Sequence, residues 1–425
     1  MQNRNELLVQ KIHGLIEEYC NINFDFSFDS VAKKVRLHEP TFGADEINAA
    51  LDVLLSTNVT QGKLVRDFEK QFAAKFGATH GVMNNSGSSA NLLALASLAN
   101  PDLPDGLRKG DEVIVPALSW STTVWPIIQM GLIPVIVDID PDTLNLDLEQ
   151  VERSITTKVK AIMPVHVYGN PVDMIRLKQI CEQHNLWLVE DCCEALGAKF
   201  NGQNVGTIGD VGTYSFYFSH HISTLEGGMC ITNSFELNDL MRILRAHGWI
   251  RELENRDAYT EQYPEIDPRF MFVNVGYNLR ATELQGAFGL HQLPKLDSFV
   301  EARRETTGFW LAELAKYRDY FSFQRETEGG YSSCFGFPLV CKDNSGLDLS
   351  SLLAHLNHNG IETRPIICGN IAAQPAMRKY EHRTIGDLSN STRVMKRGFS
   401  FGNHQYIGAE GREYVVSTLK SFFGF

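Results

Sequence analysis

The segment from Thr213 to Met229 decides the fold of this 425-residue chain; it reads Thr213-Tyr214-Ser215-Phe216-Tyr217-Phe218-Ser219-His220-His221-Ile222-Ser223-Thr224-Leu225-Glu226-Gly227-Gly228-Met229. It opens with a short apolar run at 214–218, continues through a polar loop with two adjacent histidines, and ends in a Gly-Gly pair before a second apolar run at 229–231. Short apolar runs bounded by turn residues predict buried strands. No lysine occurs between Lys199 and Lys295, so the loop and its neighbours along the chain carry none.

Similar apolar runs precede this segment, and helical patterns separate them. The runs are at 112–115, 134–137, 161–165 and 186–189, and the clearest helical patterns are at 174–184 and 236–246. Apolar strands interleaved with helices predict an α/β fold, in which helices cover both faces of a mostly parallel sheet. Because such sheets bind ligands beyond the carboxyl ends of their strands, the residues that follow each strand are the first candidates for a site.

Three regions follow from the patterning. Residues 1–39 form an N-terminal arm, with a short amphipathic helix and a Phe-rich connector. Residues 40–295 form the large domain around the predicted sheet. Residues 296–425, which begin with a long helix, form a smaller C-terminal α+β domain.

Composition excludes several classes of partner. A formal net charge of -12 leaves no basic face for nucleic acid. The longest apolar stretch, 124–137, contains two prolines and is too short to span a bilayer, so no membrane partner is expected. The N-terminus has no signal-peptide pattern, and the eight cysteines have no paired spacing. We therefore expect a cytoplasmic protein.

Three features could hold a ligand at the expected edge of the sheet. The turn Asn84-Asn85-Ser86-Gly87-Ser88-Ser89-Ala90-Asn91 opens a helix, whose free N–H groups suit a phosphate, although small residues also cap helices for structural reasons. Trp120 could stack on a planar ring, but tryptophan is more often part of a core. Asp191 ends a predicted strand, where its carboxylate could pair with a protonated ring nitrogen or simply cap a helix.

Together with the 213–229 segment, further landmarks in a fixed order indicate a family. They are Thr60-Gln61-Gly62, Ser86-Gly87-Ser88, Asp138-Ile139-Asp140-Pro141, His166-Val167-Tyr168-Gly169, Glu190-Asp191, Gly276-Tyr277-Asn278-Leu279-Arg280 and Thr363-Arg364-Pro365. From Pro40 onward the chain resembles the DegT-type sugar aminotransferases, fold type I enzymes of pyridoxal 5'-phosphate (PLP) that act on nucleotide-linked keto sugars. The resemblance implies a large cofactor-binding domain with a mostly parallel mixed sheet and a small C-terminal domain.

One substitution sets this chain apart from most of that family. The residue five positions after the serine of the Ser-Phe segment is the family's Schiff-base lysine, and here Ser215 plus five is His220. An imidazole can move protons but cannot form the covalent imine, so the cofactor is expected to bind non-covalently, with pyridoxamine 5'-phosphate (PMP) as its resting form. His221 is the structural alternative next door, because neighbouring residues on an extended loop point to opposite sides.

The same substitution resembles a subgroup, the nucleotide-linked 4-keto-6-deoxyhexose 3-dehydratases of 3,6-dideoxysugar biosynthesis, which includes O-antigen sugars of lipopolysaccharide. Its members remove the sugar's 3-hydroxyl with histidine as the acid and base, and His220 is the expected catalytic residue here. A histidine with a pKa near 6.5 suits both proton removal and protonation of the leaving hydroxyl.

The resemblance also implies the contacts to the cofactor. Gly87, Ser88 and Ser215 are expected to bind its phosphate, Trp120 to stack on its ring, and Asp191 to pair with the ring nitrogen. Glu194 stands where many relatives have Gln or His beside the ring hydroxyl, which leaves that contact open. Asn278 resembles a residue that reaches the phosphate from the partner subunit, which implies a homodimer with shared active sites, although an ordinary turn residue is its structural alternative.

Two kinds of dehydratase fit the sequence. One acts on a CDP-linked sugar, carries an iron–sulfur cluster and works with a reductase; the other acts on a GDP-linked sugar and regenerates PMP from glutamate. Cys193 matches the first cluster ligand, but residues 249–274 contain no cysteine, and a cluster needs four thiolates. We therefore expect no iron–sulfur cluster and no metal, with L-glutamate as the amine donor.

Two further alternatives stay open. A nucleotide-sugar 4-aminotransferase that tolerates histidine would give an amino product, and a catalytically silent relative would act as a sensor or scaffold. The retained Asp191, Ser215 and Asn278 argue against the silent relative, because such a protein needs no electron sink. Arg364 and His404 could approach the substrate, but as lone residues they are more often structural.

Overall fold

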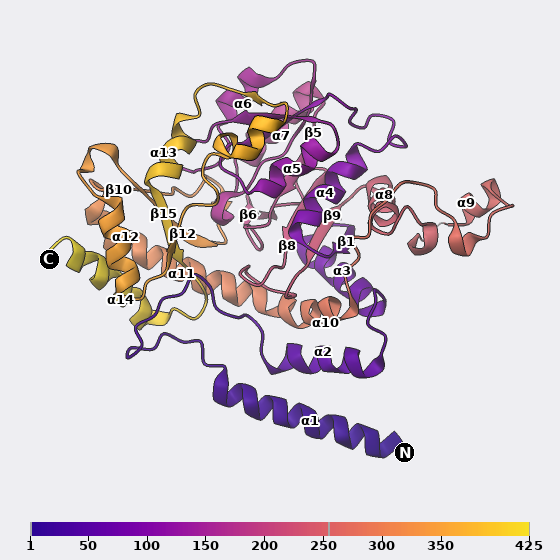
Figure 1. Cartoon of the computed structure of the whole chain (residues 1–425), viewed down its shortest axis with the longest axis horizontal. Coiled ribbons are helices and arrows are strands. Elements are labelled where there is room, and N and C mark those ends of the chain that lie inside the picture. Colours follow the sequence, from indigo (N-terminus) through magenta and orange to yellow (C-terminus); the bar gives the residue numbers. More distant parts are fainter. Residues whose placement is uncertain (1, 254–255, 425) are drawn as a thin grey trace.

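A central eight-stranded sheet organises the computed structural model, which describes residues 2–253 and 256–424 (Figure 1). In spatial order its strands are β1 (His80–Asn84), β9 (Gly228–Thr232), β8 (Val211–Ser215), β5 (Trp187–Asp191), β4 (Val159–Ile162), β2 (Glu112–Pro116), β3 (Ile133–Val137) and β14 (Arg383–Thr384). Every neighbouring pair is parallel except the two pairs that β9 makes with β1 and β8. The prediction of a mostly parallel α/β sheet is confirmed.

Helices cover both faces of this sheet. The helices of the large region are α3 (Lys63–Phe76), α4 (Gly87–Leu98), α5 (Ser121–Gln129), α6 (Leu148–Ser154), α7 (Met174–His184), α8 (Phe235–Arg245) and α10 (Glu283–Gln292), with α2 (Ala44–Ser56) packed outside α10 (Figure 1). One apolar core contains Phe68, Phe72 and Tyr214, and another contains Leu93 and Met241. Because both faces are covered, β2, β8 and β9 are buried at every position, which explains their continuous apolar runs.

The element boundaries show where sequence patterns stop being informative. The helical pattern at 174–184 coincides with α7, which Asp173 caps by accepting a hydrogen bond from the Arg176 N–H. The run predicted at 214–218 lies three residues too late, because β8 ends at Ser215 and Phe216 begins the loop toward the histidines. Strand β1 was not predicted from the sequence. Its Gly81 lies where a side chain does not fit, since a Cβ there would be 2.7 Å from the carbonyl oxygen of Glu69.

The C-terminal region has its own core and sheet. The long helix α11 (Leu296–Leu314) leads into the antiparallel strands β10 (Phe321–Phe323), β12 (Gly336–Cys341), β15 (Gly398–Gly402) and β13 (Thr363–Arg364), with helices α12 (Leu349–His358), α13 (Ser389–Arg397) and α14 (Gly408–Phe422). Trp310, Phe399 and Phe401 lie in this core. The region also returns β14 to the large sheet, beside β3, so the division at residues 295 and 296 stays a prediction.

Two segments lie at the margins of the molecule. The arm begins with α1 (Gln2–Asn23), longer than the short helix expected, which lies alongside α2 (Figure 1). The connector then packs on the C-terminal region, where the tilted rings of Phe26 and Phe28 contact Tyr406 and Tyr414. Residues 256–274 project to the right in Figure 1 and carry the short helix α9 (Asp257–Gln262). Within the described residues, none of the helices combines the length and apolar character needed to cross a membrane.

The smallest sheet lies between the two regions. It has three short strands, β11 (Gly330–Tyr331), β6 (Lys199–Phe200) and β7 (Gln203–Asn204). Because β11 belongs to the C-terminal region and β6 to the large one, this sheet joins them and anchors the chain that runs from Tyr331 toward the site.

Candidate active site

A cavity of about 460 Å³ opens at the carboxyl ends of β2, β5 and β8. Seven of the eight predicted site residues line it: Gly87, Ser88, Trp120, Asp191, Glu194, Ser215 and His220. They come from separate strand ends and loops, so the sheet topology brings them together at the edge where ligands of such sheets bind. Asn278 does not line this cavity; it is exposed, and its side chain accepts a hydrogen bond from the Nε of Arg280.

The start of α4 makes a close-fitting anion cradle. Ser86 caps the helix by accepting a hydrogen bond from the Ser89 N–H at 3.1 Å, and the N–H groups of the first turn have no acceptor within the helix. A Cβ at Gly87 would lie 2.5 Å from the Cβ of Ser215, so only glycine permits this approach of α4 to the end of β8. Backbone N–H groups and the Ser215 hydroxyl therefore fit a phosphate at the positive end of the helix dipole.

Asp191 presents a buried carboxylate without a cationic partner. Its Oδ2 accepts hydrogen bonds from the Nδ2 of Asn91 (2.9 Å) and the hydroxyl of Thr123 (2.8 Å), and its Oδ1 accepts from the Cys193 N–H. Among the described residues, no Lys, Arg or His forms an ion pair with it. A buried carboxylate held only by neutral donors is stabilised by a cationic ligand, and the protonated nitrogen of a PLP ring fits that position.

Glu194 faces the same cavity in a less polar setting. Burial raises the pKa of its carboxyl to about 7, although Arg364 and a hydrogen bond from the Tyr168 N–H (3.0 Å) oppose the rise. A carboxyl with a pKa near neutrality can hold or release a proton at the pH where the protein works. The departure from Gln or His at this position therefore places a titratable group beside the cavity.

The two adjacent histidines have different surroundings. His220 lines the cavity, and its Nδ1 has no hydrogen-bond partner among the described residues. His221 is fully buried, and its Nε2 contacts the carbonyl oxygen of Ser333 at 3.0 Å. The structure thus turns only His220 toward the cavity. Burial lowers the pKa of His220 to about 3, and the charge of Arg364 adds to the decrease. The ring is therefore neutral, and it is a weaker base than the pKa near 6.5 expected from the sequence implies.

The structure adds residues that the sequence patterns did not single out. Thr123 binds Asp191, and Phe335, which arrives from the C-terminal region, lines the cavity next to His220. The Ser-Thr-Thr stretch after Trp120 was a signal for Thr123; nothing in the sequence pattern indicated Phe335. Arg364, ranked low from sequence, also lines the cavity, whereas His404 does not.

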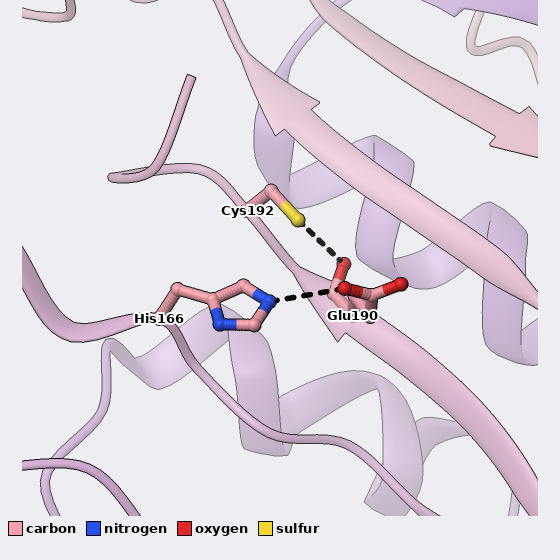
Figure 2. A group of neighbouring side chains, drawn as sticks. All are labelled: His166, Glu190 and Cys192. Carbon is pink, nitrogen blue, oxygen red and sulfur yellow. Dashed lines mark hydrogen bonds and ion pairs between the residues drawn. The ribbon is translucent and has the colours of Figure 1, made fainter. Parts of the chain in front are cut away.

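A cluster of His166, Glu190 and Cys192, on either side of Asp191 in the chain but outside the cavity lining, has the donor atoms of a metal site (Figure 2). Those atoms already form hydrogen bonds: His166 Nε2 contacts the Glu190 carboxylate at 3.2 Å, and the Cys192 thiol donates to the Glu190 carbonyl oxygen at 3.6 Å (Figure 2). The Glu190 carboxylate accepts hydrogen bonds from the N–H groups of residues 206, 208 and 209, and His166 Nδ1 accepts one from the Val172 N–H. Burial raises the pKa of the Cys192 thiol well above its usual value. The cluster therefore acts as a structural hydrogen-bond network beneath Asp191.

Comparison with known proteins shows the family to which this chain is similar. Residues 40–420 match the model of the DegT/DnrJ/EryC1/StrS aminotransferase family. The chain is 41% identical over 396 residues to a GDP-4-keto-6-deoxy-D-mannose 3-dehydratase from Yersinia pseudotuberculosis, covering 91% of this chain and 100% of that protein. It is 38% identical over 436 residues to the lipopolysaccharide biosynthesis protein RfbH of Salmonella typhimurium, covering 98% of each.

The solved structures agree with these sequence matches. A crystal structure of GDP-4-keto-6-deoxymannose-3-dehydratase with a trapped PLP-glutamate geminal diamine superposes with a TM-score of 0.86 at 38% identity, covering 91% of this chain and all of that one. The resemblance drawn from the sequence landmarks is therefore confirmed.

Proposed function

Because the chain belongs to the DegT/DnrJ/EryC1/StrS aminotransferase family, we propose that it is a PLP- and PMP-dependent 3-dehydratase of a GDP-linked 4-keto-6-deoxyhexose, with L-glutamate as the amine donor. The observation that carries the proposal is His220, which faces the cavity at the position of the family's Schiff-base lysine. A protein of this family without that lysine cannot hold the cofactor covalently, but it can still move protons.

The cavity walls supply binding and orientation. When bound, the cofactor supplies the amine that reacts with the 4-keto group and a ring that accepts electron density. Gly87, Ser88 and Ser215 hold its phosphate, and Asp191 keeps the ring nitrogen protonated. Trp120 is 58% exposed at the cavity edge, where its face is free to stack on the ring.

His220 moves the proton that dehydration requires. As a neutral imidazole, His220 would accept a proton at a ring nitrogen and deliver it to the 3-hydroxyl, which then leaves the sugar as water. Glu194, with its pKa near 7, holds a proton beside the same cavity, where the family relatives contact the ring hydroxyl.

The second subunit completes the site in this proposal. Asn278 lies outside the cavity of its own chain and is exposed, so it is free to reach the phosphate site of a second copy. This supports a homodimer with shared active sites. The eight cysteines are all free thiols, which supports the cytoplasm as the compartment, and the similarity to RfbH supports a role in 3,6-dideoxysugar and O-antigen biosynthesis.

The product mass tests the proposal. The purified chain is incubated with PLP, glutamate and GDP-4-keto-6-deoxymannose, and the sugar nucleotide is analysed by mass spectrometry. We expect a 4-keto-3,6-dideoxy product and release of 2-oxoglutarate. An amino product that retains its 3-hydroxyl would instead show a 4-aminotransferase, and turnover of only the CDP-linked substrate with an added reductase would show the other dehydratase type.

Substitutions at the two histidines provide the matched control. His220→Asn is expected to lower the rate of dehydration by about 10²- to 10⁴-fold, the usual contribution of a general acid–base group. Replacing its neighbour, as His221→Asn, is expected to affect stability more than the chemical step, because His221 binds Ser333 away from the cavity. Equal loss of rate in both variants would contradict the role of His220.

A further inference from the structure

The helix α1 carries an apolar stripe that nothing in the described part of the chain covers. Leu8, Ile12, Leu15, Tyr19 and Ile22 are between 39% and 72% exposed. Their spacing of 4, 3, 4 and 3 residues is the heptad pattern of a coiled-coil seam. The helix also lies before residue 40, where the match to the family model begins.

A second seam on the same helix is already occupied. Val9, His13, Ile16 and Cys20 have the same 4-3-4 spacing and are half-buried or buried. They face α2, where His13 Nε2 contacts the Asp52 carboxylate at 2.9 Å. Because a step of one residue turns a helix by about 100°, the exposed seam lies roughly a quarter-turn away from α2. One seam therefore holds α1 on its own chain and leaves the other open to a second helix.

The charges beside the exposed seam match those of a second α1 helix only when the two helices are antiparallel. Lys11 and Glu18 lie immediately before Ile12 and Tyr19, at the flanking positions of the heptad, and both are exposed. Among the described residues neither has an ion-pair partner. In an antiparallel pair of α1 helices, Lys11 of each copy lies opposite Glu18 of the other. In a parallel pair, Lys11 faces the position of Ile16 instead, so the charges do not meet.

We propose that α1 pairs with α1 of a second copy of this chain as an antiparallel coiled coil. Leu8 of one copy packs in a layer with Tyr19 of the other, and Ile12 packs in a layer with Leu15. The antiparallel orientation also sets the opposite ends of the two helix dipoles beside each other. The pairing uses only residues that precede the match to the family model and that do not line the cavity.

Cysteine cross-linking of the full-length chain tests the orientation. Chains with Leu8→Cys and Tyr19→Cys are produced separately and also co-expressed, then oxidised mildly and examined on non-reducing gels. In the antiparallel pair the two copies of residue 8 are separated by about 16 Å along the axis, beyond the reach of a disulfide. We therefore expect cross-linked dimers only in the co-expressed sample. Cross-linking of each variant alone, or no cross-linking in any sample, would overturn the proposal.

A charge swap tests the recognition. Lys11→Glu and Glu18→Lys, each placed in the cross-linking background, set like charges opposite one another and should reduce the yield of cross-linked dimer at least twofold. The combined Lys11→Glu and Glu18→Lys chain should recover the yield. Leu7→Cys, a 60% exposed position off the seam, is the control for non-specific cross-linking. If the yield of cross-linked dimer does not change with these substitutions, α1 does not recognise α1 of a second copy through these charges.

Discussion

The phenyl ring of Phe335 packs against the imidazole of His220, with ring centroids 5.3 Å apart and an angle of 56° between the planes. The same ring contacts buried His221 at 5.5 Å, so it lies against both histidines. The backbone of Phe335 is fixed at both ends, since its N–H donates to the Tyr168 carbonyl and its carbonyl accepts from Arg303 Nη1 at 3.0 Å. A rigid wall of this kind holds a catalytic ring in one orientation.

Phe335→Leu should therefore impair the chemical step more than binding. We expect kcat to fall on the order of tenfold with a small change in KM, because a small displacement of a catalytic group is costly to the rate. Stability should fall by about 1 kcal/mol. Steady-state kinetics and urea unfolding measure the two effects. Phe337→Leu, which alters the core around Trp310 and Phe401, is the control and should lower stability without the selective loss of kcat.

Glu194→Gln should change how stability depends on pH. Burial raises the pKa of Glu194 to about 7 in the folded chain, above its ordinary value, so between pH 4.5 and 7 the folded state binds more protons than the unfolded state. The contribution of Glu194 to stability is therefore present below pH 4.5 and is lost as pH rises to about 7. Urea unfolding of the cofactor-free protein at pH 5 and pH 8 should show that the variant loses less unfolding free energy between these two pH values than the unchanged protein does. If the difference in unfolding free energy between the two pH values is the same in both proteins, the pKa of Glu194 is not raised by folding.

Gly87→Ala should weaken cofactor binding. The added Cβ would lie 2.5 Å from the Cβ of Ser215, so α4 and the end of β8 must move apart, and the phosphate cradle loses its shape. We expect the Kd for PLP to rise by about tenfold or more, equivalent to roughly 1.4 kcal/mol, in an absorbance titration. Gly308→Ala is the control, because a Cβ on that α11 position meets no atom within 4 Å and should leave the Kd unchanged.

Glu69→Gln should destabilise the large region strongly. Buried Glu69 accepts hydrogen bonds from Arg245 Nη1 at 2.5 Å and from Arg242 Nη1 at 3.0 Å. Burial opposes its ionised form, yet the two arginines outweigh that effect and lower its pKa. Among the described residues, removing the charge leaves the fully buried Arg245 with Glu252 alone as a counter-ion. We expect a loss of about 3–5 kcal/mol in urea unfolding.

The control for Glu69 is an exposed ion pair. Glu149→Gln removes the charge that pairs with Arg153, and both of those side chains are more than 60% exposed. Its effect should be within about 0.5 kcal/mol, because solvent screens such pairs. Comparable losses in the two variants would contradict a special role for the buried network.

The large fold was predictable because its signals are local. Buried strands at 112–116 and 187–191 and the α7 helix follow from apolar runs and periodicity within a few residues. The sequence also shows that His220 lies five residues after Ser215, and this position predicted a cofactor that is bound non-covalently. Strand β14 was not predictable, since its two residues belong to the large sheet only through their pairing with β3.

The sequence by itself determined which chemical groups exist: a histidine at the lysine position, Asp191 at the end of a buried strand, and Gly87 before an apolar helix. The tertiary structure alone decided which of two adjacent histidines faces the cavity, and it brought Phe335 and Arg364 to that cavity. The physical reason is distance along the chain. Strand ends follow from local patterns, but a contact between residues more than 100 positions apart is fixed only when the sheet and the C-terminal region pack together.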